Sequence, residues 1–323
     1  GSSMCSISIL ITYYNERQWL TQCLESVFAQ TVQPQEVLVY DDAGPSRAAD
    51  FLPANPLSKK VRIIRGEKNM GLSAARNVLM AEAASEYIRY LDADDLLEPY
   101  CIERLQQAMQ EHPADVYVNE IRSVKMETGQ PLCDAVLELH KLKQDESIVS
   151  FAIRGCLLPG ATTFKRSLGR QLKGFKAGEL LQAEDYEFNV RLVQAASSVR
   201  IIREALMIQR HRDGSMSKNA EQCFLEGIKA VNLLAQQLPA GYEQDLAVRM
   251  SEHGKILYKI GNRTAAQQAF AQAKKLSPAV HTEESWLYRT LTNTLGQLTA
   301  EKLSKTYRQL LPQSLRRRLH ISH

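Results

Sequence analysis

Between Ser6 and Gln110 the sequence alternates between short apolar runs and longer amphipathic runs. The short runs are rich in β-branched residues and have the length of strands. The longer runs repeat their apolar residues at i, i+3 and i+4, as a helix with one buried face does. This alternation predicts an α/β fold with a mostly parallel sheet flanked by helices. The expected strands are 6–12, 36–40, 61–64 and 87–91, and the expected helices are 17–28, 71–84 and 96–110.

Polar residues follow three of these strands, at the point where each strand ends. Carboxyl ends of parallel strands meet at one edge of a sheet, where ligands bind. We therefore expect these side chains to lie close together. The sequence has no G-x-G-x-x-G after its first strand and no G-x-x-x-x-G-K-[ST], which argues against a dinucleotide-binding dehydrogenase and a P-loop enzyme. The strand-end residues are Thr12, Tyr14, Asn15, Asp42, Asp92, Ala93, Asp94 and Asp95.

The run Asp92-Ala93-Asp94-Asp95 carries three carboxylates directly after an apolar strand. A carboxylate cluster is costly unless a positive charge lies on it. Oxygen ligands of this kind suit a hard divalent cation, Mn²⁺ or Mg²⁺. A competing interpretation is structural, because Asp95 could cap a helix that begins at Leu96.

Composition limits the classes of protein to consider. The 323 residues, 44% of them hydrophobic and 24% charged, are typical of a globular protein with one large domain and a smaller one. A net charge of +4 is too small to indicate a nucleic-acid partner. The six cysteines form no C-x-x-C pair, which favours reduced thiols in the cytosol over a disulfide framework or a zinc site. Every apolar run is shorter than the roughly 18 residues that a membrane span needs.

The pattern changes after Pro113. We expect a first domain over residues 4–218 and a helical region over 219–323, because apolar residues recur at helical spacing from Asn219 onward. Residues 254–278 have the pattern of one tetratricopeptide-like helix pair, which favours a helical appendage over a stacked array. The expected strands are 116–124, 162–164 and 199–208; the expected helices are 141–155 and one opening at Glu184, and 132–139 is ambiguous.

Taken in order, the motifs of residues 6–217 resemble those of inverting family 2 glycosyltransferases with the GT-A fold, of the kind that build bacterial surface polysaccharides. The sequence departs from the family pattern in the last motif. Many members carry a histidine where this chain has Arg212, and His211 lies one position earlier. The matching stretches are Thr12-Tyr13-Tyr14-Asn15, Asp41-Asp42-Ala43-Gly44, residues 69–77 around Arg76, Asp92-Ala93-Asp94-Asp95, Glu184-Asp185 and residues 210–217.

The resemblance implies a nucleoside-diphosphate sugar donor, with UDP favoured. Asp94 would hold Mn²⁺ or Mg²⁺, with Asp92 near the ribose or behind the metal. Asp42 would accept a hydrogen bond from uracil, and Thr12 and Tyr14, with Asn15 and Ala93 beside them, would surround the nucleotide. Arg76 would help to hold it, although a helix-surface role is the alternative.

The resemblance also implies a general base. Asp185 would take the proton of the acceptor hydroxyl, and Glu184 would orient the donor sugar or cap a helix. His211 is a candidate metal ligand or a loop histidine. Arg210 and Arg212 are candidates for contact with the diphosphate, because guanidinium groups match phosphate oxygens.

The acceptor implied is a bacterial surface glycan such as lipopolysaccharide or capsule, free or lipid-linked, and the class is a hexosyl or N-acetylhexosaminyl transferase. Two alternatives are a nucleotidyltransferase and a non-catalytic sugar-nucleotide-binding or scaffold protein. In the C-terminal tail, an apolar stripe lies beside basic residues, a pattern of helices on anionic membranes. Packing on the helical region and a homodimer contact are the competing interpretations of Leu303, Tyr307, Leu310 and Leu311 beside Lys302, Lys305 and Arg308.

Overall fold

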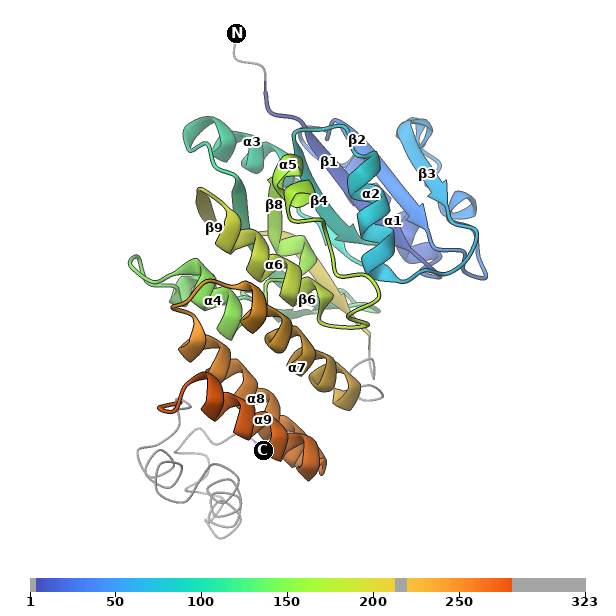
Figure 1. Ribbon diagram of the computed structural model, residues 1–323. Helices are drawn as coiled ribbons and strands as arrows, with labels where there is room; N and C mark the ends of the chain where they lie inside the picture. The colour runs from blue at the N-terminus through green and yellow to red at the C-terminus, as the bar shows by residue number, and fades with distance from the viewer. Residues whose placement is uncertain (1–3, 213–219, 281–323) are drawn as a thin grey trace. The chain divides into compact units, whose positions relative to one another are not determined.

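The computed structural model describes residues 4–212 and 220–280 (Figure 1). The chain divides into two compact units, Gly1–Ala220 and Glu221–His323. Residues 213–217 of the last motif and the whole C-terminal tail, with its predicted membrane or dimer contact, lie outside the described residues.

The first unit contains a sheet with helices on its faces, and in Figure 1 helices α2, α5 and α6 lie on the side of the sheet nearer the viewer. Its strands are β1 (Ile7–Tyr13), β2 (Glu36–Asp41), β3 (Val61–Arg65), β4 (Tyr87–Asp92), β5 (Leu96–Leu97), β6 (Val116–Lys125), β7 (Pro131–Cys133), β8 (Thr162–Lys165) and β9 (Val199–His211). Its helices are α1 (Gln18–Phe28), α2 (Leu72–Glu82), α3 (Cys101–Glu111), α4 (Ile148–Arg154), α5 (Arg166–Gln171) and α6 (Glu184–Ala195).

The sheet order is β3-β2-β1-β4-β8-β6-β9-β5, with β7 paired to β6. Strands β3, β2, β1 and β4 run parallel, as the alternating pattern predicts, and β6 runs parallel to β9. Strand β8 is antiparallel to both of its neighbours, and β5 and β7 are antiparallel to the long strands that they pair with. The predicted α/β class with helices on a mostly parallel sheet is confirmed, and one reversed strand, β8, joins its two parallel parts.

The register of the parallel strands places their polar ends side by side. Thr12 of β1 lies opposite Asp92 of β4, and Tyr13 lies opposite Asp41 of β2. All seven residues of β1 are buried, because both faces of this central strand are covered. The expected convergence of these strand ends on one edge is confirmed, and the rigid core behind them fixes their positions.

The predicted helix at 96–110 is wrong at its start. Leu96 and Leu97 form β5 instead, paired with Ile208 and Met207 of β9, and α3 begins at Cys101. Two apolar residues after a turn can complete a sheet edge as well as open a helix, and the long-range pairing decides. Asp95 therefore caps no helix, so the structural interpretation of the aspartate run fails.

Three other segments also differ from expectation. The helix predicted at 141–155 is limited to α4, whose start is capped by Ser147, which accepts a hydrogen bond from the amide of Ser150. The ambiguous stretch 132–139 contains the end of β7 and the start of a short 3₁₀ helix, Leu139–Lys141. Helix α5 was not predicted, because its basic residues mask its short apolar pattern.

The second unit contains α7 (Ala220–Gln237) from its second residue onward, and α8 (Glu243–Ile260) and α9 (Arg263–Leu276). A small core joins α8 to α9 through Leu257, Tyr258, Ala266 and Phe270. Asn262 caps α9 by accepting a hydrogen bond from the amide of Ala265. The helical composition predicted for this region is confirmed over the part that the structure describes. Of the helices in residues 4–212 and 220–280, none combines the length and hydropathy that crossing a bilayer requires.

Glu120 organises the irregular segment that follows β7. Its carboxylate is 3% exposed and accepts hydrogen bonds from three backbone amides, those of Ile121, Leu137 and Leu139, at 2.7, 2.9 and 3.0 Å. Buried amide groups of a loop need such a partner, because water does not reach them.

We predict that Glu120→Ala lowers the free energy of unfolding of the first unit by about 3 kcal/mol or more, since three buried amides lose their acceptor. Glu204→Ala is the matched control, because Glu204 lies on the neighbouring strand in an exposed pair with Arg104 and should cost under about 1 kcal/mol. Urea unfolding followed by tryptophan fluorescence measures both. Equal losses in the two variants would contradict the role given to Glu120.

Candidate active site

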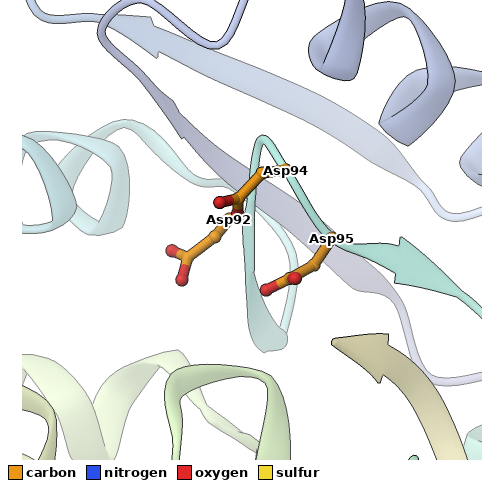
Figure 2. Close-up of side chains that lie close together, drawn as sticks. All are labelled: Asp92, Asp94 and Asp95. Carbon is orange, nitrogen blue, oxygen red and sulfur yellow. The ribbon is translucent and has the colours of Figure 1, made fainter. Parts of the chain in front are cut away.

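The acidic turn, Asp92 to Asp95, follows β4 and is closed by a 3.0 Å hydrogen bond from the amide of Asp95 to the carbonyl of Asp92. One carboxylate oxygen from each of Asp92, Asp94 and Asp95 lies within 4.8 Å of the other two. Figure 2 shows the three side chains leaving the turn toward a common side. In the described part of the chain, these three form the one group of acidic, histidine or cysteine residues close enough to share a metal ion.

Crowding makes this turn a site for positive charge. Burial, and then the Asp92 carboxylate, raise the pKa of Asp94 to about 6, while Arg212 opposes the rise. Burial and the carboxylates of Asp94 and Asp92 raise the pKa of Asp95 well above its ordinary value. An all-oxygen donor set under mutual repulsion fits a divalent cation such as Mn²⁺ or Mg²⁺, which would relieve that repulsion.

Two arginines at the end of β9 contact the acidic turn in different ways. Buried Arg210 holds the turn at two points: its side-chain Nε donates to the backbone carbonyl of Asp94 at 2.6 Å, and its own amide donates to the carboxylate Oδ1 of Asp95 at 3.0 Å. Arg212 instead faces a carboxylate, with its Nη2 3.5 Å from Asp94 Oδ2. His211 lies between them on the strand and is outside the carboxylate group, because successive strand residues point to opposite faces.

Beside the acidic turn, a pocket of about 350 Å³ is lined by Asn15, Glu16, Arg17, Gln18, Trp19 and Arg212. The Arg212 guanidinium stacks on the Trp19 ring, 3.7 Å from its centre. Glu16 shapes the pocket loop by accepting hydrogen bonds from the amides of Tyr14 and Asn15. Trp19 and Glu16 were missed as site residues, since Trp19 fits the apolar face of α1 and a glutamate after a strand carries no distinctive signal.

The loop before α2 is tied to Asp42 at the end of β2. Asp42 Oδ1 accepts from the amide of Met70 at 2.8 Å, and its Oδ2 accepts from the amide of Gly71 at 3.0 Å. Gly71 has a φ of 86°, a conformation that glycine adopts without strain, and it begins α2. Thr12 is buried nearby in β1, whereas the Tyr14 side chain is 46% exposed.

Glu184 and Asp185 form the first turn of α6, after Ala183 in a left-handed conformation (φ 61°). Acidic residues are favoured at a helix start, and Asp185 Oδ1 accepts from the amide of Tyr186 at 2.8 Å. Burial, and then the Glu184 carboxylate, raise the pKa of Asp185 to about 6, while Arg76 opposes the rise. A carboxylate with this pKa can take up a proton near neutrality.

Arg76 of α2 joins the two acidic sets. It is 2% exposed, its Nη1 donates to Glu184 Oε1 at 2.9 Å, and its Nη2 lies 3.3 Å from Asp92 Oδ1. The structure therefore brings the acidic turn, Arg212 and the Glu184–Asp185 pair around one edge of the sheet, with Asp42 and Tyr14 at the ends of the next strands.

Comparisons with known proteins agree with this geometry. The sequence profile of "Glycosyl transferase family 2" matches residues 8–153. Glycosyltransferase GlyG of Streptococcus pneumoniae serotype 4 is 26% identical over 262 residues, covering 71% of this chain and 86% of GlyG. Succinoglycan biosynthesis protein ExoW of Rhizobium meliloti is 28% identical over 340 residues, covering 94% of this chain and all of ExoW.

Among solved structures, residues 1–349 of TarS from S. aureus, in complex with UDP-GlcNAc, superpose on this chain with a TM-score of 0.69. The sequence identity is 19%, and the match covers 94% of this chain and 92% of the TarS chain. At that identity the likeness shows a shared fold.

Proposed function

The chain carries a family 2 glycosyltransferase domain of GT-A fold, and we propose that it transfers one sugar from a UDP-sugar to a hydroxyl of a bacterial surface glycan, with inversion. The observation that supports this most directly is the pairing of an acidic turn with a separate Glu184–Asp185 pair at the carboxyl edge of the sheet. A turn that can hold a divalent cation and a carboxylate placed to act as a base are two devices that such a transfer can use.

The nucleotide is proposed to bind at the ends of β1 and β2. Asp42 is held by the amides of Met70 and Gly71, and each carboxylate oxygen has a further lone pair that can accept the ring N–H of uracil. The exposed ring of Tyr14 offers a stacking surface, and Thr12 is buried two residues before it. UDP is supported as the nucleotide because TarS, which shares the fold, has been solved with UDP-GlcNAc and with UDP.

The diphosphate is proposed to lie between the acidic turn and the pocket at Arg212. Asp94 and Asp92 would hold Mn²⁺ or Mg²⁺, and a bound cation supplies charge neutralisation to the departing diphosphate. Arg212 lies beside Asp94 and can donate to phosphate oxygens, whereas Arg210 is committed to the backbone of the turn. This arrangement favours Arg212 over His211 as the residue that completes this side of the site.

The acceptor hydroxyl is proposed to attack from the side of α6. Asp185 takes its proton as the oxygen approaches the anomeric carbon opposite the leaving group, which inverts the configuration there. Glu184 is held by Arg76 and is the less suitable base, since its carboxylate is engaged in an ion pair. A glycan acceptor is supported by ExoW, which is named for succinoglycan biosynthesis.

We predict that Asp94→Asn weakens Mn²⁺ binding to the nucleotide-free protein by at least about 10-fold, because one charged oxygen ligand is lost. Asp134→Asn is the control, because Asp134 is an exposed aspartate outside the carboxylate group. Electron paramagnetic resonance of free Mn²⁺ measures both. Unchanged affinity in Asp94→Asn, or full transfer activity in a chelator, would refute the metal site.

We predict that Asp185→Asn lowers kcat by about 100-fold or more, as the loss of a positioned base does, and leaves donor binding near normal. The assay is mass analysis of products from a panel of UDP-sugars and glycan acceptors. If no sugar is transferred by the unaltered protein from any donor, the proposed reaction fails. If Asp185→Asn is active and Glu184→Gln is inactive, the base is Glu184.

The pH dependence follows from the raised pKa of Asp185. A base must be ionised, so kcat/KM should fall as pH drops through about 6 and level off above it. Glu184, Asp92 and Arg76 are the charged groups that act on Asp185. Glu184→Gln removes a neighbouring negative charge and should move the acidic limb to lower pH. A limb that stays at the same pH in Glu184→Gln would argue against Asp185 as the titrating group.

A further inference from the structure

Arg76 is almost completely buried, and both of its terminal nitrogens point at carboxylates from other elements. Nη1 lies 2.9 Å from Glu184 Oε1, and Nη2 lies 3.3 Å from Asp92 Oδ1. These partners are far apart in the chain: Asp92 ends β4, and Glu184 begins α6. One planar guanidinium therefore links the acidic turn to Glu184, which is the residue next to the proposed base Asp185.

The surroundings of Arg76 fix this link on both sides. Its own carbonyl accepts a hydrogen bond from the Tyr90 hydroxyl of β4 at 2.7 Å. The Phe175 ring lies 5.2 Å from its guanidinium carbon. The next residue, Asn77, holds the backbone of Phe175 through two hydrogen bonds, of 2.8 and 2.9 Å. Helix α2 thus fastens both β4 and the loop that leads to α6.

The arginine is held at an energetic cost. Its Nε is buried and has no hydrogen-bond partner among the described residues. An unsatisfied buried donor costs about 1–3 kcal/mol. Sites where a protein accepts such a cost are often sites where geometry is needed for function.

We propose that Arg76 is a positioning residue that sets Asp92 and the Glu184–Asp185 pair in a single geometry, and that it does not itself bind the nucleotide. This proposal rests on the proposed function and differs from the nucleotide contact that the family resemblance implies for this residue. The ion pair occupies Oδ1 of Asp92 and leaves its Oδ2 for the donor side. On the other side, a held Glu184 fixes the first turn of α6, from which Asp185 projects.

The test begins with Arg76→Gln, measured against Arg62→Gln as the matched control. Arg62 pairs with Glu82 at an exposed position, so its loss should leave kcat unchanged. We expect Arg76→Gln to lower kcat about 100-fold and to change the dissociation constant of metal-free UDP less than about threefold. We expect Arg76→Lys to restore less than a tenth of the lost rate. The single ammonium group of lysine cannot pair with two separate carboxylates in the way that the two terminal nitrogens of a guanidinium do. A large loss of UDP affinity at unchanged kcat would overturn the proposal, since Arg76 would then be a nucleotide contact.

A double-mutant cycle tests the coupling to Glu184. If Arg76 acts through Glu184, the Arg76→Gln and Glu184→Gln losses in kcat should be strongly non-additive, with the double variant near the worse single variant. Losses that multiply would show independent roles and overturn the proposal. Should Arg76→Gln fail to fold, Arg76→Lys takes its place in the cycle with the same expected non-additivity.

A ligand-free crystal structure of the variant gives a readout that does not depend on transfer activity. We expect the Glu184 and Asp92 carboxylates to move apart when the guanidinium is removed. If both stay in place, the positioning role is refuted even where transfer is normal. If they move and the unaltered protein transfers no sugar, the proposed reaction fails while the positioning role stands.

Discussion

Repulsion among carboxylates at one edge of the sheet is the constraint on which the site depends. Asp92, Asp94 and Asp95 share a turn, and Glu184 and Asp185 open a helix nearby. Ionised side chains in such a cluster destabilise one another unless positive charge lies among them. Three arginines from other elements supply part of that charge: Arg76, Arg210 and Arg212. The remaining negative charge is what a divalent cation would offset, and that cation would in turn attract the diphosphate of a nucleotide.

Because its carboxylates repel one another, the acidic turn needs a rigid support, and strand β4 provides it. Arg89, in the middle of that strand, is fully buried. Its Nη1 donates to Asn119 of β6 and to Thr163 of β8, and its Nη2 donates to the carbonyl of Gly160. Burying a guanidinium without a carboxylate is costly, so its neutral acceptors must be well placed. This network connects β4 to β8 and β6, the next two strands of the sheet, and so restrains the strand from which the acidic turn begins.

The sequence was sufficient for features that depend on local pattern. The alternation of strand and helix, the parallel direction of the first strands and the convergence of their polar ends on one edge follow from apolar periodicity. The register then places Thr12 opposite Asp92. It was insufficient where distant pairing decides. Leu96 and Leu97 form a strand that pairs with β9, and Arg76 is a buried bridge between two carboxylates, because the partners of these residues lie far along the chain. For Arg76 the sequence had offered a nucleotide contact, with a helix-surface arginine as the alternative. Trp19 was not recognised as a site residue, because it also fits the apolar face of helix α1.

The candidate site is assembled from two parts of the chain, and the proposed role of Arg76 is to hold these two parts together. The family 2 profile ends at residue 153, so the nucleotide-side motifs belong to the matched part, while Glu184, Asp185 and the β9 arginines lie beyond it. In the proposed mechanism, the base Asp185 must lie at a set distance from the donor. A rigid arginine on α2, within the matched part, meets that need by reaching across to the first turn of α6. In the proposed mechanism, this contact fixes the first turn of α6, and with it Asp185, relative to the acidic turn.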